Sequence, residues 1–190
     1  MDFAQLAQIS RQAGLAGREE QSWRFGIPEQ NGSLVALLES LPKGVNITEL
    51  QYGRTDSAEQ HPILRLEAPH QEGAVFEGWL QTHSLLATDV SHAPQTRHRV
   101  IPFSPELFHA PWFVEVEFRE RAGALLSFMK EVSDVASLCY FNYSYSGERV
   151  GRALLGLDFT SPQQREEAKA VLRQLEGKVL RSLREVLDLP

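Results

Sequence analysis

Residues 23–34 read WRFGIPEQNGSL, and residues 114–125 read VEVEFRERAGAL. The two stretches align without a gap at an offset of 91 positions, so that Gly32 falls on Gly123. Before each glycine, apolar residues alternate with other residues, which is typical of a half-buried strand. The alignment predicts an internal repeat in which a first strand leads through a glycine turn into a helix.

The helix after each glycine is predicted from apolar residues at positions i, i+3, i+4 and i+7. These are Leu34, Leu37, Leu38 and Leu41 in the first copy, and Leu125, Phe128, Met129 and Val132 in the second. At the same offset we expect a second strand at 46–52 and 137–143. We expect a third strand near 63–66 and 153–159, followed by a second helix through 76–83 and 168–175. Residues 85–90 supply a closing strand for the first copy.

The order β-α-β-β-α is that of the split βαβ, or ferredoxin-like, arrangement, with helices on one face of an antiparallel sheet. We therefore predict an α/β (α+β) chain of two tandem ferredoxin-like βαββαβ modules, at 18–91 and 112–190. Residues 92–111 contain four prolines and form the linker, and residues 1–17 form a short N-terminal connecting helix. At the C-terminus the repeat predicts a closing strand, but the apolar residues recur at helical spacing and favour a helix. Those residues are Val179, Leu180, Leu183, Val186 and Leu187.

Composition argues against several classes of function. The net charge of −6 and the lack of a basic cluster disfavour binding to nucleic acid or to an anionic membrane. The single cysteine, Cys139, allows no intrachain disulfide, and no apolar run approaches the roughly 20 residues that span a bilayer. We expect a soluble, unexported, cytoplasmic protein whose small modules pack together or form a homo-oligomer.

No motif for catalysis stands out. The six histidines lack metal-ligand spacing, and GxSxG, P-loop and GxGxxG patterns are absent. Two other classes of function are an RNA-binding module and a small enzyme that uses Arg121 to hold an anion. Residues 65–67 and 156–158 put no aromatic side chains on the central strands, and no activated nucleophile accompanies Arg121, so both alternatives are weaker.

The glycine turns and two tyrosines are the candidate binding features. Free backbone N–H groups at a helix N-terminus favour a carboxylate or phosphate, and glycine lets a ligand approach closely. A plain turn is the ordinary interpretation of one such glycine, while recurrence of the turn in a repeat favours function. Tyr52 and Tyr143, equivalent at the end of the second strand, either close a small pocket or are structural.

These residues are similar to the C-terminal regulatory region of biosynthetic threonine deaminase, which carries two ACT-like domains in tandem. The stretches that carry the resemblance are 25–34 and 46–52 in the first copy and 122–128, 141–143 and 151–154 in the second. Residues 2–17 resemble the helix that joins the catalytic and regulatory parts of that enzyme. The resemblance implies allosteric feedback control of branched-chain amino-acid biosynthesis by isoleucine, with valine as antagonist.

The resemblance also implies a ligand site, formed by the loop before the first helix and by nearby strand residues. Carried over by position, its residues are Gly32, Ser33, Leu34 and Tyr52, together with Gly123, Ala124, Leu125, Val132, Tyr143 and Phe159. The family usually has a basic residue directly after each tyrosine, whereas this chain has Gly53 and Ser144.

Catalysis and cofactor are implied to lie elsewhere. Pyridoxal phosphate would belong to a catalytic domain or subunit, the parent being a threonine ammonia-lyase, and we expect neither cofactor nor metal in this chain. The alternative is a stand-alone ACT-like sensor or docking protein for a different amino-acid enzyme.

Overall fold

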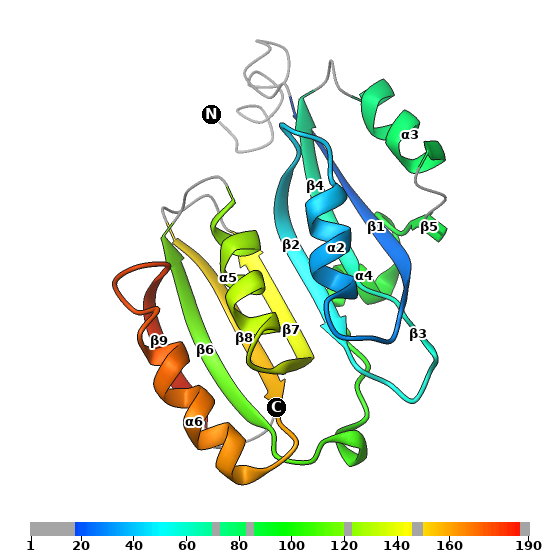
Figure 1. Ribbon diagram of the computed structural model, residues 1–190. Helices are drawn as coiled ribbons and strands as arrows, with labels where there is room; N and C mark the ends of the chain where they lie inside the picture. The colour runs from blue at the N-terminus through cyan, green and yellow to red at the C-terminus, as the bar shows by residue number, and fades with distance from the viewer. Residues whose placement is uncertain (1–17, 70–72, 83–85, 120–122, 146–149, 187–190) are drawn as a thin grey trace.

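The computed structural model describes residues 18–69, 73–82, 86–119, 123–145 and 150–186 (Figure 1). The first module is built from β1 (Arg18–Pro28), α2 (Ser33–Ser40), β2 (Asn46–Gly53), β3 (Glu59–Gln60), β4 (Ile63–Pro69), α3 (Gly73–Thr82) and β5 (Leu86–Asp89). The second is built from β6 (Trp112–Arg119), α5 (Ala124–Ser133), β7 (Ser137–Tyr145), β8 (Val150–Asp158), α6 (Pro162–Arg173) and β9 (Leu180–Val186). The predicted order βαββαβ is therefore confirmed in both copies, and the first copy adds the short strand β3. The predicted helix over residues 1–17 lies outside the described residues.

All strands belong to one antiparallel sheet. Its order is β3-β1-β4-β2-β7-β8-β6-β9, with β5 also paired to β1. The modules join edge to edge where β2 pairs with β7, in a register that places Leu50 opposite Tyr143 and Tyr52 opposite Phe141. Because each module contributes an edge strand to this seam, neither edge is left with unpaired backbone groups there.

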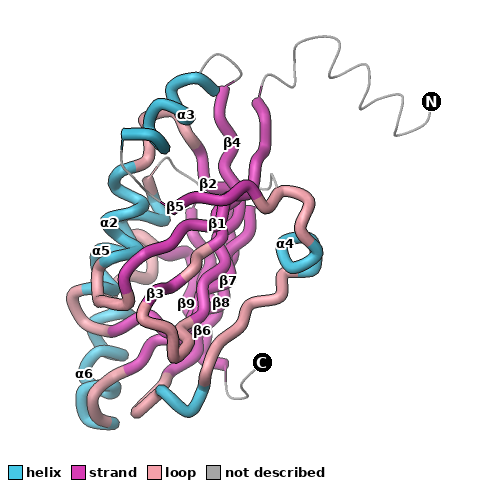
Figure 2. The backbone as a smooth tube through the Cα atoms, turned by 90° about the vertical axis from the view of Figure 1, so that its right-hand side faces the viewer, coloured by secondary structure: helices cyan, strands magenta, loops and turns pink. Residues whose placement is uncertain are grey.

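The main core lies between the sheet and the helices. Figure 2 shows α2, α3, α5 and α6 on one face of the sheet. Phe25, Leu50 and Leu64 of the first module and Phe141 and Leu155 of the second are completely buried. Removing such a side chain from water contributes about 1.5–3 kcal/mol, so the apolar alternation seen in the sequence accounts for the layered packing.

The linker covers part of the opposite face. It contains the short helix α4 (Pro94–His98) and the 3-10 turn η2 (Pro105–Leu107) (Figure 2). Its apolar side chains pack on a second, smaller cluster that contains Phe113, Cys139 and Tyr140; the linker residues in it are Ile101, Phe103 and Phe108. The linker is therefore packed against the sheet as part of the fold.

Arg99 fixes the linker across the seam. Its Nη1 lies 3.1 Å from Glu49 Oε2 on β2, and its Nη2 donates to the Tyr143 carbonyl on β7 at 2.9 Å and contacts Asn142 Oδ1. One side chain thus contacts both modules on the face away from the helices.

The helix favoured for the C-terminal segment is wrong. Residues 180–186 form β9, which pairs antiparallel with β6, Leu183 opposite Val116. A bulge between Glu117 and Phe118 shifts the register, so that Leu180 and Leu183 both pack on the main core although three positions apart. The bulge breaks the two-residue period and so produces an apolar spacing that resembles a helix.

Candidate ligand-binding site

The site starts from the turn that joins β1 to α2. Gly32 has a φ of 88°, in the left-handed region that glycine adopts without strain. Among the described residues no side chain caps the N-terminus of α2, and of the first-turn N–H groups that of Ser33 donates to the Gln30 carbonyl at 3.2 Å. Gly123 repeats this geometry before α5 with a φ of 78°. The turn itself is therefore preserved in both copies.

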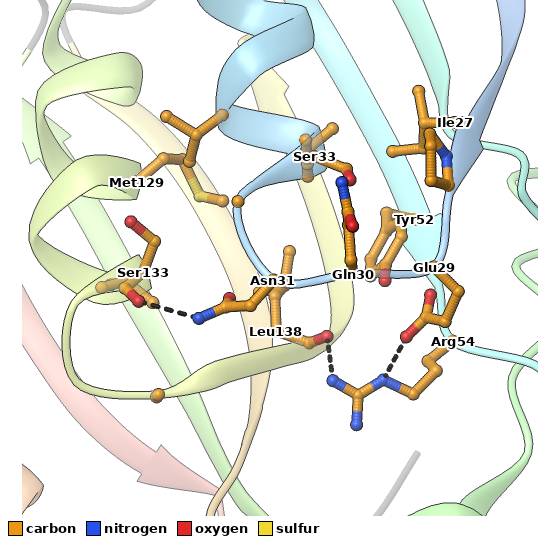
Figure 3. A pocket seen from close by; sticks show the side chains of 16 residues that line it. Ile27, Glu29, Gln30, Asn31, Ser33, Tyr52, Arg54, Met129, Ser133 and Leu138 are labelled. Atoms are coloured by element: carbon orange, nitrogen blue, oxygen red, sulfur yellow. Dashed lines mark hydrogen bonds and ion pairs between the residues drawn. The ribbon is translucent and has the colours of Figure 1, made fainter.

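A small cavity lies beside the first turn, between the two modules (Figure 3). Its volume is about 40 Å³, room for a few water molecules. The first module lines it with Ile27, Pro28, Glu29, Gln30, Asn31, Gly32, Ser33, Leu34, Val35, Tyr52 and Arg54, and the second with Met129, Val132, Ser133, Ala136 and Leu138. Asn31 Nδ2 donates to the Ser133 carbonyl at 3.1 Å, which ties the turn to the end of α5.

Arg54 organises the polar side of the cavity. Its Nε lies 3.0 Å from Glu29 Oε1, and its Nη2 donates to the Leu138 carbonyl at 3.0 Å (Figure 3). Its Nη1 lies 3.5 Å from Asp158 Oδ2. The guanidinium group therefore connects the turn after β1, the start of β7 and the end of β8.

The titration of Glu29 and Tyr52 is shifted by their surroundings. Burial raises the pKa of Glu29, and the positive charge of Arg54 and hydrogen bonds from Tyr52 and Arg54 oppose that rise. Burial and then the negative charge of Glu29 raise the pKa of Tyr52 above its ordinary value. Tyr52 therefore remains a neutral hydroxyl that donates to the Glu29 carboxylate.

A more open polar groove adjoins the cavity. It shares Asn31, Arg54, Ser133 and Ala136 with the cavity and continues along residues 134–137 and 158–160. Asp158 is almost fully buried there, and its Oδ1 accepts hydrogen bonds from the backbone N–H groups of His109 and Ala110 at 2.9 and 3.0 Å. Since Asp158 also faces Arg54, it links the end of the linker to a residue that lines the cavity.

The residues expected at the site fall into three places. Gly32, Ser33, Leu34 and Tyr52 line the cavity together with Val132, which comes from the other copy. Phe159 lines the adjoining groove. Gly123, Ala124, Leu125 and Tyr143 lie in the second copy and line neither space. Ligand binding by any of them stays a prediction.

Sequence reasoning missed Glu29, Arg54 and Met129. Gly53 stands where the family usually has a basic residue, and a Cβ there would lie 2.1 Å from the Pro102 carbonyl oxygen of the linker. The linker therefore requires glycine at this position, and the next residue, Arg54, brings a guanidinium group to the cavity. Arg54, a basic residue one position after the expected one, was the feature of the sequence that could have indicated this site.

Two curated relatives match most of the chain. A mitochondrial threonine dehydratase of Schizosaccharomyces pombe is 25% identical over 178 residues, which cover 92% of this chain and 30% of the relative. A biosynthetic L-threonine dehydratase of Burkholderia multivorans is 25% identical over 162 residues, 83% of this chain and 32% of the relative. The chain thus spans about a third of the length of these relatives.

Similarity to solved structures is weaker. The alignment with the regulatory subunit of aspartate kinase from Thermus thermophilus covers 83% of this chain and 95% of that subunit, with 12% identity and a TM-score of 0.30. The alignment with aspartate kinase from Synechocystis covers 90% of this chain and 44% of the kinase, with 9% identity and a TM-score of 0.32. Overlaps at these scores carry no weight for fold or function.

A family model matches the second module. The model of the C-terminal regulatory domain of threonine dehydratase matches residues 110–184, a range that runs from just before β6 into β9. No helix among the described residues is long and apolar enough to cross a bilayer. The chain is therefore similar to the regulatory region of threonine dehydratase over most of its length, and its second module is the part that matches the family model.

Proposed function

We propose that this chain is an amino-acid-binding unit that gives allosteric feedback control of threonine dehydratase, with isoleucine as the inhibitory ligand and valine as its antagonist. The observation that carries the proposal is the cavity between the modules. It combines the glycine turn and Tyr52 of one copy with the Val132 side of α5 from the other. The threonine dehydratase relative and the matched model of a regulatory domain support the amino-acid class of ligand.

The small size of the cavity suggests how binding becomes a signal. A cavity of about 40 Å³ holds only a few water molecules, and in this proposal isoleucine enters by displacing the turn before α2 from the end of α5. The turn and α5 belong to different modules. A ligand that binds more tightly when the turn has moved away from α5 therefore shifts the packing of one module on the other. A ligand regulates only through such a difference in affinity between two states.

The partner is a catalytic part that this chain does not contain. The two relatives are about three times longer than their matched segments, and we assign pyridoxal phosphate and threonine deamination to that remainder. In this proposal the chain itself performs no catalysis and works in the cytoplasm within a homo-oligomer.

The test is isothermal titration of the chain with isoleucine, valine, leucine, threonine and phenylalanine. We expect saturable binding of isoleucine and valine that is lost in Val132→Phe, because the larger ring fills the apolar wall of the cavity. The matched control is Leu41→Phe, which places a phenylalanine at the equivalent position of the first copy, a position that does not line the cavity. It should bind isoleucine as the unaltered chain does.

Other outcomes decide between the candidates. Binding of a different amino acid, with isoleucine and valine inert, would favour a sensor for another enzyme. No binding of any of the five by a folded chain would contradict the proposed function.

A further inference from the structure

We propose that the Glu29–Arg54 ion pair is the head-group site of this cavity, and that it selects a free α-amino acid as a zwitterion. The ligand carboxylate contacts Arg54 and the N-terminus of α2, and the ligand ammonium group contacts Glu29. The inference rests on the proposed function and specifies which chemical form of the ligand the site accepts.

The two charges lie together at one side of the cavity. Figure 3 shows Glu29 and Arg54 adjacent below Tyr52, with Met129 of α5 on the far side. The two side chains are 28% and 17% exposed, and Arg54 Nε lies 3.0 Å from Glu29 Oε1. The cavity thus has a charged end and an apolar end, as an amino acid with an aliphatic side chain has.

One buried donor at this cavity lacks an acceptor among the described residues, whereas Arg54 Nε is paired with the Glu29 carboxylate at 3.0 Å. Ser33 Oγ, at the first residue of α2, is buried and has no hydrogen-bond partner. A buried donor left without an acceptor is destabilising. A ligand carboxylate between the start of α2 and Arg54 would accept from Ser33 Oγ and form an ion pair with the guanidinium group.

Charge balance favours a zwitterion over a singly charged ligand. Glu29 and Arg54 neutralise one another in the empty site, and burial already raises the pKa of Glu29. A zwitterion exchanges this one ion pair for two and leaves the site neutral. An amine alone or a carboxylate alone leaves one buried charge unpaired, which is strongly unfavourable.

The adjoining groove gives the charged end a route to solvent. Arg54 and Asn31 line both spaces, and the groove is the wider of the two. A ligand can therefore approach Arg54 from the groove and insert its side chain towards Val132 once the turn has moved.

The first test uses the unaltered chain and three related compounds. Isothermal titration compares isoleucine with isoleucinamide, which lacks the carboxylate, and with 3-methylpentanoate, which lacks the ammonium group. We expect each analogue to bind at least about tenfold more weakly than isoleucine, the effect of losing one hydrogen-bonded charge. This comparison does not depend on the folding of any variant.

The second test removes one charge from the protein. Glu29→Gln and Arg54→Met should each weaken isoleucine binding by about tenfold or more, with folding monitored by urea unfolding. The control is Glu39→Gln, the same chemical change in the more exposed pair of Glu39 Oε1 with Lys130 Nζ, 2.5 Å apart between α2 and α5. It should leave isoleucine affinity within about twofold, since exposed pairs contribute little.

The outcomes separate this inference from the function on which it rests. Isoleucine, the amide and the acid binding with equal affinity would overturn the zwitterion site and leave the regulatory function standing. The same holds if Glu29→Gln and Arg54→Met both bind isoleucine as the Glu39→Gln control does. No isoleucine binding to the unaltered chain would overturn both proposals.

Discussion

The two copies share a turn and differ in what surrounds it. Gly32 and Gly123 both precede a helix with positive φ, 88° and 78°, and neither helix has a side-chain cap among the described residues. At the offset of the repeat, however, Arg54 in the first copy corresponds to Tyr145 in the second. The backbone geometry was kept through the duplication, whereas the cation that completes the candidate site stands in one copy only.

Tyr143 illustrates the same difference. Its ring packs edge-on against Phe118, with ring centroids 5.8 Å apart, and a Cβ at Gly151 would lie 2.9 Å from its hydroxyl oxygen. Its counterpart, Tyr52, lines the cavity beside Glu29 and Arg54. An equivalent tyrosine is therefore part of a tight aromatic packing in one copy and part of a polar wall in the other. A glycine turn and a tyrosine do not define a site without the charge pair and the facing module.

The largest expected effect tests the close approach of the linker to the first copy. In Gly53→Ala the new Cβ would lie 2.1 Å from the Pro102 carbonyl oxygen, so the linker must move and the Ser104 N–H to Arg54 carbonyl hydrogen bond of 2.9 Å is lost. We expect a loss of about 3 kcal/mol in the free energy of unfolding, measured with urea. Ser144→Ala, at the equivalent position, should stay within about 0.5 kcal/mol. Equal stability of the two variants would contradict this account of Gly53.

Local periodicity predicted the module architecture because each helix and strand buries one apolar face. The stripe Leu34, Leu37 and Leu38 is buried on α2, and Phe25 and Ile27 are buried on β1. The closing strand of the second copy escaped this reasoning. Its pairing with β6 and the bulge at Glu117 and Phe118 are long-range features that no local spacing encodes.

The candidate site was predictable only in its local part. Gly32, Ser33 and Tyr52 follow from the turn and the family resemblance, and all three line the cavity. Met129 and Leu138 could not be predicted in this way. They line the cavity only because β2 pairs with β7, and the repeat does not reveal which strand edges pair. Joining the modules at this seam turns a feature of one copy into a site shared by two.

A smaller effect sharpens the comparison between the glycine turns. Gly32→Ala and Gly123→Ala should each destabilise the fold by about 1 kcal/mol, because an L side chain is strained at positive φ. Neither new Cβ meets another atom within 4 Å, so strain is the only cost. Isoleucine titration should separate them, since only Gly32 lines the cavity. Equal loss of binding in the two variants would mean that the copies contribute equally.

The smallest expected effect concerns the charge pair that distinguishes the first copy. Burial is the largest cause of the raised pKa of Glu29, and Arg54 opposes it. A carboxyl group with a raised folded-state pKa stabilises the fold below its unfolded pKa, and that contribution is lost as pH rises through the folded pKa. Between about pH 4 and about pH 7 the unaltered chain should therefore lose stability relative to Glu29→Gln, which has no such titration.

Urea unfolding of both proteins across that range measures the difference, with Glu39→Gln as the same substitution in the exposed pair with Lys130. If the unaltered chain instead becomes more stable than Glu29→Gln as pH rises, attraction to Arg54 outweighs burial in setting the pKa of Glu29. The head-group pair would then be held together more firmly than an exchange with a zwitterion requires, and the difference between the two copies would lie in the stability of the fold and not in ligand recognition.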